Sequence, residues 1–194
     1  METARTPDAV AWSRRSARIA DDDGRDVFTL DAVEAPAAWS DSAVNVVASR
    51  YFREGERSVR QLLDRVVGTI ARWVREQDLG GGSYADELHR IMVHQRGASN
   101  SPVWFNVGVD ERPQCSACYI LSVEDRLDAI LDLARIEGLI FQRGSGCGTN
   151  LSSLRSSREK LSRGGTASGP VSFMRGYDAF AGVGKSCGRT RRAA

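Results

Sequence analysis

Apolar residues recur at helical spacing in the part of the chain that follows residue 41. This periodicity predicts helices over residues 42–53, 58–76 and 84–96, with the glycine run at 80–82 as a break before the third. Each helix would bury one apolar face, formed by Val44, Val47, Ala48 and Tyr51, by Leu62, Leu63, Val66, Ile70 and Trp73, and by Leu88, Ile91 and Met92, respectively.

The segments on either side of these helices follow other patterns. Residues 1–40 show no sustained periodicity, which predicts a loosely ordered arm with at most a short strand at 27–30. Two short apolar runs further along, at 101–106 and 118–121, are typical of buried strands.

A fourth helix is expected to begin at Ser122, where Asp125 stands at the position of a capping-box acid. Its apolar stripe would consist of Leu127, Ile130, Leu131 and Ala134. Another helix is expected over 171–181, directly after Gly169 and Pro170. Strands that alternate with helices in this way predict an α/β architecture with parallel strands.

Composition and charge narrow the class of protein. The 194 residues are 41% hydrophobic and 27% charged, which is ordinary for a folded chain, and the net charge of +2 provides no global field that would recruit nucleic acid or a membrane. No run has the pattern of a signal peptide or the length of a membrane span, so we expect a cytoplasmic protein. In that compartment the thiols would stay mostly reduced, which argues against a disulfide framework among Cys115, Cys118, Cys147 and Cys187.

Cys115 and Cys118 form a C-x-x-C pattern, which suggests half of a zinc site or a redox pair. A closed zinc site would need two further ligands, but the other two cysteines are isolated, and His89 and His94 share one predicted helix. The same pattern also fits two small buried side chains. By itself, it does not choose among these readings, although no metal site is expected.

Glycine-rich runs with basic neighbours occur at 144–148, 163–165 and 185–192. Free backbone amides beside Arg or Lys are what a polyphosphate requires. None of the three runs is a Walker loop or a G-x-G-x-x-G motif, so each one alone also fits an ordinary turn or a solvated basic stretch.

The order of the motifs adds a resemblance. The relevant blocks are 101–106 (SPVWFN), 113–118 (PQCSAC), 122–125 (SVED), 144–150 (GSGCGTN), 154–159 (LRSSRE), 164–173 (GGTASGPVSF) and 190–194 (TRRAA). Together they resemble consecutive blocks of the cobalamin-dependent (class II) ribonucleotide reductases, from about Trp39 to the last residue.

The resemblance implies a fold. Members of this family have a ten-stranded α/β barrel preceded by helices, so we expect the arm at 1–40, a helical amino-terminal region at 41–97 and the first part of the barrel at 98–194. The barrel would be incomplete in this chain, and the runs near Ser101 and Cys118 would be early barrel strands.

It also implies roles for individual residues. Cys118 resembles one of two thiols that reduce the ribose, whereas Cys115 resembles a neighbour without that role. Removal of the 2′-hydroxyl consumes two electrons, which a cysteine pair supplies by becoming a disulfide that an external dithiol such as thioredoxin then reduces. The partner thiol, the thiyl-radical cysteine and a glutamate beside it would lie beyond Ala194, so the chain alone is expected to be inactive.

Nucleotide contacts are carried over in the same way. Ser101 resembles the position near the substrate phosphate and ribose, and Ser145 and Gly146 resemble a backbone stretch that lines the same pocket. Asp125 resembles the residue that holds the sugar of a deoxynucleotide effector, and Arg155 and Arg163 would contact its phosphates.

The last glycine-rich run resembles the loop that connects the effector site to the substrate site. It consists of Lys185, Ser186, Cys187, Gly188, Arg189, Thr190, Arg191 and Arg192. Cys187 replaces a glycine of the family pattern and Gly184 replaces an aliphatic residue, so the conformations open to this loop should differ, because only glycine adopts positive φ at little cost.

The expected function is the reduction of ribonucleotides to 2′-deoxyribonucleotides, with adenosylcobalamin as the radical source and deoxynucleotides as specificity effectors. Expected partners are the ribonucleotide, the effector, the dithiol reductant, the remainder of the reductase chain and a second copy in a homodimer, without direct nucleic-acid or membrane binding. The sequence does not choose between diphosphate and triphosphate substrates, and no residue is assigned to the cobalamin. A non-catalytic nucleotide-binding remnant and a small zinc-binding module are the alternatives.

Overall fold

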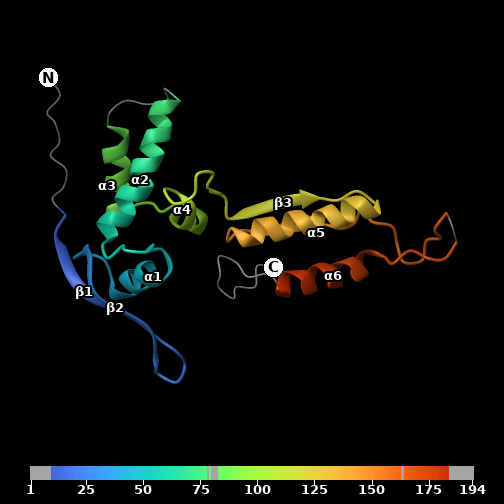
Figure 1. The fold of residues 1–194 in the computed structure, drawn as a ribbon, viewed down its shortest axis with the longest axis horizontal. Helices are drawn as coiled ribbons and strands as arrows, with labels where there is room; N and C mark the ends of the chain where they lie inside the picture. The colour runs from blue at the N-terminus through green and yellow to red at the C-terminus, as the bar shows by residue number, and fades with distance from the viewer. Residues whose placement is uncertain (1–9, 78, 80–82, 163, 184–194) are drawn as a thin grey trace. The chain divides into compact units, whose positions relative to one another are not determined.

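The computed structural model describes residues 10–77, 79, 83–162 and 164–183 (Figure 1). The chain divides into two compact units, Met1–Pro113 and Gln114–Ala194, which are considered separately below. This division differs from the three regions expected from the sequence, because the segment at 98–113 groups with the helices that precede it.

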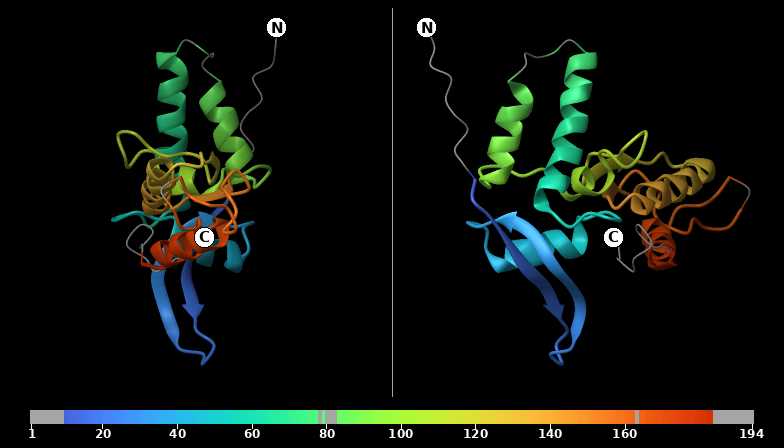
Figure 2. Two further views of the ribbon diagram at one scale, coloured as in Figure 1. Left: turned by 90° about the vertical axis from the view of Figure 1, so that its right-hand side faces the viewer. Right: turned by 60° about the vertical axis from the view of Figure 1, so that its left-hand side comes forward.

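The amino-terminal unit begins with an antiparallel hairpin of β1 (Trp12–Ala20) and β2 (Asp26–Pro36), whose turn extends beyond the helices of this unit (Figure 2). The expected loosely ordered arm is therefore wrong for the described residues before position 40. Arg15 pairs with Val33 but Ala17 pairs with Leu30, so the strands slip past each other at a bulge, where Ala32 has φ +58°. A bulge interrupts the two-residue alternation that marks a strand, which is why the periodicity was weak.

Three helices follow, as predicted. They are α1 (Asp41–Arg50), α2 (Val59–Glu76) and α3 (Tyr84–Val93). The side chains of Ser40 and Ser58 accept hydrogen bonds from Ala43 N and Arg60 N, respectively, and so cap the first two helices. α1 and α3 both end about a turn earlier than expected.

The core of this unit lies between the hairpin and these helices. Ala17, Val33 and Ala35 of the hairpin are fully buried, and they belong to one cluster with residues of all three helices, among them Val44 of α1, Leu63 of α2 and Met92 of α3. Within α2 the predicted apolar face is buried near its start, whereas its later members Ile70 and Trp73 are only half-buried. Apolar burial of this kind is the main stabilising contribution to the unit.

The run at 101–106 forms a short helix, α4 (Ser101–Asn106), so the predicted strand is wrong. Pro102 lies in the first turn of α4, where its fixed φ suits a helix and its missing N–H costs no hydrogen bond. Asn100, the residue directly before the helix, is extended. An apolar run of six residues is too short for its length to distinguish strand from helix.

The second unit contains a β–α–β arrangement followed by a further helix. Its elements are β3 (Cys118–Ser122), α5 (Leu127–Gln142), β4 (Gly146–Asn150) and α6 (Pro170–Val183). β3 and β4 are parallel, which confirms the predicted α/β architecture. Ile140, Phe141 and Ala181 of the two helices pack against Tyr119 and Cys147 of the strands, so α5 and α6 cover one face of the pair. The described residues of this unit form a two-stranded sheet and no closed barrel.

The start of α5 differs from the prediction. Ser122 is the last residue of β3 and Arg126 precedes the helix, so Ser122 does not cap it and the capping-box reading of Asp125 is wrong. The buried stripe is also shifted, because Leu127 and Leu131 are exposed while Ile130 and Leu133 are buried. Most of the glycine-rich run at 144–148 lies in a strand, since β4 begins at Gly146, so the reading of this run as an ordinary turn is wrong.

Candidate functional site

The register of the two parallel strands brings Cys118 beside Gly146, two residues that the sequence assigned to reducing and substrate-binding roles, respectively. Cys118 is the Cα partner of Gly146, and Gly146 N donates to Ala117 O at 2.8 Å. The starts of both strands are therefore hydrogen-bonded to each other, and Cys118 is exposed at this end of the sheet.

Ser145, the neighbouring substrate-pocket candidate, is used by the fold. Its side chain is buried, and its hydroxyl donates to Ser116 O at 2.5 Å and accepts a hydrogen bond from the side-chain amide of Gln114. These bonds tie the segment before β3 to the start of β4. Ser145 thus fixes the start of β4, and the backbone amides of Ser145 and Gly146 are also used by the fold, since they donate to Ile140 O and Ala117 O, respectively.

Cys118 lies on the face of the sheet that is opposite α5 and α6. Side chains alternate along a strand, so Tyr119 and Leu121 face the helices while Cys118 and Ile120 face away, and Ile120 is 96% exposed. The partners of these two outward residues on β4 are Gly146 and Gly148, which leave the backbone of this face accessible.

The other described cysteines have protected thiols. Cys147 faces the helices, where burial, followed by the charge and hydrogen bond of Glu137, raises the pKa of its thiol to about 12. Burial also raises the pKa of the half-buried Cys115. Cys118 differs from both in being exposed, so it is the most accessible of the described cysteines.

The effector candidates Asp125 and Arg155 contact each other. Arg155 Nε lies 2.6 Å from Asp125 Oδ2, and Arg155 Nη2 donates to Asp125 O at 3.3 Å. The hydrogen bond from Arg155 lowers the pKa of the Asp125 carboxyl. One residue follows β3 and the other follows β4, so the pair lies at the carboxyl ends of the parallel strands, the usual place for a ligand in such folds.

Cys118 and the Asp125–Arg155 pair therefore occupy opposite ends of the same strand pair. β3 runs from Cys118 to Ser122, which spans roughly 13 Å at the usual rise per residue. A reductive site at the amino ends and an anion-binding site at the carboxyl ends would be separate but joined by a rigid element.

The remaining sequence-derived residues are placed elsewhere. Ser101 is the first residue of α4 in the amino-terminal unit, where its hydroxyl lies 3.1 Å from that of Tyr51. Arg163 and the run from Lys185 to Arg192 lie outside the described residues. Within the described ranges, no group of three or more His, Cys, Asp or Glu side chains is arranged to hold a metal ion.

Sequence reasoning missed a polar cluster between α5, α6 and β4. Glu137 of α5 is hydrogen-bonded to Cys147, and burial raises its carboxyl pKa. Tyr177 of α6 donates to Ile130 O at 2.9 Å, and burial followed by the charge of Glu137 raises its pKa. A glutamate within an apolar stretch of α5 was the available signal, but only the fold shows which residues meet it.

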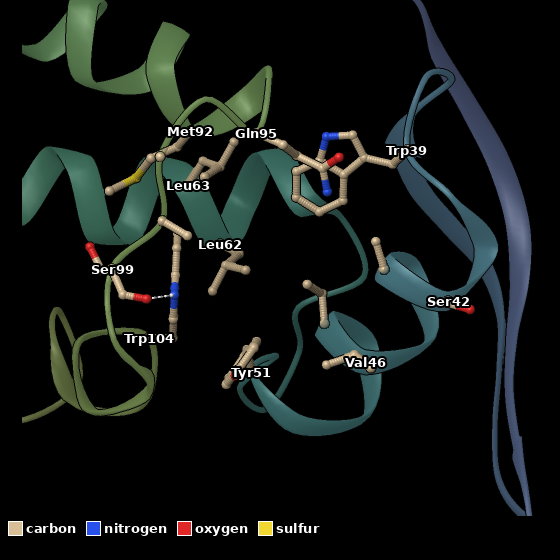
Figure 3. Close-up of a pocket in the computed structure, with 14 residues that line it drawn as sticks. Trp39, Ser42, Val46, Tyr51, Leu62, Leu63, Met92, Gln95, Ser99 and Trp104 are labelled. Atoms are coloured by element: carbon tan, nitrogen blue, oxygen red, sulfur yellow. Dashed lines mark hydrogen bonds between the residues drawn. The ribbon is translucent and has the colours of Figure 1, made fainter. Parts of the chain in front are cut away.

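The amino-terminal unit also holds a cavity of about 500 Å³ (Figure 3). Its walls are mainly apolar and include the aromatic side chains of Trp39, Tyr51 and Trp104. The indole N–H groups of Trp39 and Trp104 donate to Val93 O and Ser99 O, respectively, which fixes the orientation of both rings. None of its lining residues is charged.

Comparison with known proteins defines the class and then the family. A model described as ribonucleotide reductase, barrel domain, matches residues 116–194. The structure is similar to that of a class Id ribonucleotide reductase alpha subunit from Actinobacillus ureae, with a TM-score of 0.60 and 19% identity over 73% of this chain and 25% of that one. The described elements thus have the fold of part of a ribonucleotide reductase alpha subunit.

The family follows from a second model and from the relatives. A model described as class II vitamin B12-dependent ribonucleotide reductase matches residues 13–55. Vitamin B12-dependent ribonucleotide reductases from Rhodopirellula baltica and Streptomyces coelicolor are 45% and 50% identical to this chain, over 100% and 96% of its length. The chain belongs to the vitamin B12-dependent class II ribonucleotide reductases and corresponds to their amino-terminal portion.

The match covers only part of each relative. The chain spans 22% of the R. baltica protein and 21% of the S. coelicolor protein. A vitamin B12-dependent ribonucleoside-diphosphate reductase from Mycobacterium tuberculosis is 33% identical over 78% of this chain and 22% of its own length. Separately, no described helix has the length and apolar character needed to cross a membrane.

Proposed function

We propose that the complete protein that carries this chain is a ribonucleotide reductase that converts ribonucleotides to 2′-deoxyribonucleotides, and that this chain contributes one reducing thiol and an effector site. The observation that carries the proposal is that Cys118 is exposed at the start of β3, where it pairs with Gly146 of β4. A thiol that must meet both a substrate and an external reductant has to be accessible, unlike the protected Cys147.

The reductive step balances with two thiols. Cys118 and a second cysteine beyond Ala194 together give up two electrons and two protons and become a disulfide, while the 2′-hydroxyl leaves as water and a hydrogen takes its place on the ribose. An external dithiol such as thioredoxin then exchanges with the disulfide and restores both thiols. The exposed position of Cys118 fits both encounters.

Adenosylcobalamin is the proposed cofactor, and when bound it would supply the radical that starts the reaction. The relatives are named for vitamin B12, and no described side chain is assigned as its ligand. The proposed role of Ser101 is to bind and orient the substrate through its hydroxyl. A diphosphate substrate is the form named for the M. tuberculosis relative.

The effector site is proposed at Asp125 and Arg155, with Arg163 as a further phosphate contact and the loop from Lys185 to Arg192 as the link to the substrate. A carboxylate accepts hydrogen bonds from a sugar hydroxyl and a guanidinium binds phosphate, so the pair offers both contacts side by side. The ion pair between them holds the carboxylate and the guanidinium together in the loops that follow β3 and β4.

A homodimer is proposed for the complete protein because apolar side chains are exposed on both helices of the second unit. Leu127, Leu131 and Leu139 of α5 and Met174 and Phe180 of α6 are all more than half exposed. Such a surface is typical of an interface. The expected cytoplasmic location stays a prediction.

The direct test is an assay of deoxynucleotide formation by the full-length protein with ribonucleotide, dithiol and added adenosylcobalamin. The proposal predicts product that depends on all three components. Binding of nucleotides without any product under these conditions would favour the alternative, a non-catalytic nucleotide-binding protein.

A further inference from the structure

The hydroxyl of Ser101 is held by a tyrosine that no sequence motif singled out. Tyr51 Oη lies 3.1 Å from Ser101 Oγ, although the two residues are 50 positions apart in the chain. The ring of Tyr51 also packs against two further residues of α4, with centroid distances of 6.3 Å to Trp104 and 5.5 Å to Phe105. One side chain at the end of α1 therefore contacts both turns of α4.

The opposite end of α4 is fixed by two arginines. Arg53 Nε donates to Phe105 O at 2.8 Å, and Arg65 Nη1 donates to Val107 O at 2.7 Å and to Trp104 O at 3.3 Å. The last carbonyl groups of a helix have no partner within it and favour a nearby cation. The two guanidinium groups supply hydrogen-bond donors for the carbonyl groups at the end of this short helix.

Arg65 is itself fixed by a buried ion pair. Its Nε lies 2.7 Å from Glu56 Oε1, and the side chains of Arg65 and Glu56 are only 13% and 12% exposed. A buried charge is tolerated when it is paired and hydrogen-bonded, as it is here by Glu56 and the carbonyls of α4. Because these contacts hold α4 in place, the contact at Ser101 is made by a helix with a defined position.

We infer that Tyr51 is a positioning residue for Ser101. The Ser101 hydroxyl donates a hydrogen bond to the substrate, while its oxygen accepts a hydrogen bond from the Tyr51 hydroxyl. This inference rests on the proposed role of Ser101. Phosphate oxygens only accept hydrogen bonds, so the Ser101 hydroxyl must donate to a phosphate, and its oxygen is then left to accept. The Tyr51 hydroxyl lies within hydrogen-bonding distance of that oxygen, and either hydroxyl of the pair can donate, so Tyr51 can fill this role.

The relay, that is, the hydrogen bond from Tyr51 to Ser101 followed by the one from Ser101 to the substrate, should raise the affinity for the substrate. Hydrogen bonds in series polarise one another, so a donor behind Ser101 strengthens the bond that Ser101 makes to substrate. Without the Tyr51 hydroxyl, the Ser101 side chain would be free to turn toward other acceptors. The loss should affect substrate binding more than the later chemistry.

A purely structural role for Tyr51 makes a different prediction, and the choice of variant separates the two. The Tyr51 ring forms part of the wall of the 500 Å³ cavity together with Trp39 and Trp104 (Figure 3). Removal of the whole ring would enlarge this cavity and destabilise the unit. Tyr51→Phe keeps the ring and removes only the hydroxyl, so it tests the relay.

The experiment measures KM for the ribonucleotide and kcat in the full-length reductase with Tyr51→Phe, with Ser101→Ala and with both changes. We expect each single variant to raise KM about two- to tenfold with little change in kcat, as the loss of one hydrogen bond implies. The double variant should be no worse than Ser101→Ala, because Tyr51 acts only through that hydroxyl. Tyr84→Phe, at an exposed tyrosine of α3, is the matched control and should leave both constants unchanged.

The outcomes distinguish the inference from the proposed function. An unchanged KM in Ser101→Ala would overturn the substrate role of Ser101 and the inference with it. A raised KM in Ser101→Ala with an unchanged KM in Tyr51→Phe, or with full additivity in the double variant, would overturn the positioning role of Tyr51 alone.

Discussion

Arg155 Nε lies 2.6 Å from Asp125 Oδ2, so that two residues from loops after different strands share one ion pair. The pair links the carboxyl ends of β3 and β4 and places a carboxylate beside a guanidinium at the point where an anionic ligand of a parallel sheet usually binds. Side chains that are already oriented lose less conformational entropy when a ligand binds.

The pair makes the titration of Asp125 depend on Arg155. The hydrogen bond from Arg155 lowers the pKa of Asp125, so the pair stabilises the fold above the unfolded-state pKa of an aspartate, and this contribution is lost as the pH falls through the lower folded-state value. In Arg155→Gln, the pKa of Asp125 should return toward its ordinary value. A carboxyl-carbon NMR titration checks this, and an unchanged pKa would show that the pair does not form in solution.

Arg155→Ala should weaken the binding of a deoxynucleotide effector to the full-length enzyme. A charge-assisted hydrogen bond contributes about 1.5–3 kcal/mol, so the dissociation constant should rise by roughly ten- to a hundredfold. Basal reduction without effector should change much less, because it depends on Cys118. The measurement is an effector titration scored by which substrate base is preferred.

Arg158→Ala is the matched control, since Arg158 is exposed and lies in the same loop. Its effector response should equal that of the unmodified enzyme. If Arg155→Ala instead lowers basal activity and keeps the effector response, Arg155 belongs to the substrate pocket.

Two glycines of the amino-terminal unit should respond in opposite directions to alanine. Gly108 has φ +76°, and a Cβ there would lie 2.5 Å from Arg65 Cγ, so Gly108→Ala should destabilise the unit by about 1–3 kcal/mol. Gly68, inside α2, has open space around it, so Gly68→Ala should stabilise it by about 0.5–1 kcal/mol. Denaturant unfolding followed by circular dichroism compares them, and equal effects would contradict this account of Gly108.

The two thiols on opposite faces of the sheet should differ in reactivity. At pH 8 iodoacetamide should alkylate Cys118 much faster than Cys147, whose pKa is raised to about 12. Glu137→Gln removes the charge that contributes to this shift, so the pKa of Cys147 should fall and its alkylation should accelerate. Peptide mass spectrometry over time resolves the two sites, and equal rates in the unmodified protein would mean that the helices do not protect Cys147.

The parts of the fold that the sequence predicted are those with a regular apolar period. α2 was found because Leu62, Leu63 and Val66 recur at helical spacing after the capping residue Ser58. The hairpin was missed because its inward residues include the small Ala17, and because a bulge near Ala32 breaks the alternation. The apolar run at 101–106 predicts a strand because the contacts at the end of α4 come from residues distant in the chain: the guanidinium groups of Arg53 and Arg65 donate to Phe105 O and Val107 O, respectively.

The candidate site was predictable to a similar extent. The family resemblance points to Cys118, Gly146, Asp125 and Arg155 as site residues. That Cys118 lies beside Gly146 and Asp125 beside Arg155 follows from strand register and loop geometry, which no local sequence pattern encodes. The sequence does not predict the hydroxyl contact between Tyr51 and Ser101, because the helical periodicity assigns Tyr51 to an apolar helix face. Residues that act through another side chain leave no spacing signal in a single sequence.

The most direct test of the central claim compares Cys118→Ser with Cys115→Ser in the full-length reductase, by measuring deoxynucleotide formation over many turnovers with a dithiol reductant. The account predicts that Cys118→Ser abolishes multiple turnover, because no disulfide can form, whereas Cys115→Ser retains it. Sustained turnover in Cys118→Ser would contradict the assignment of Cys118 as a reducing thiol.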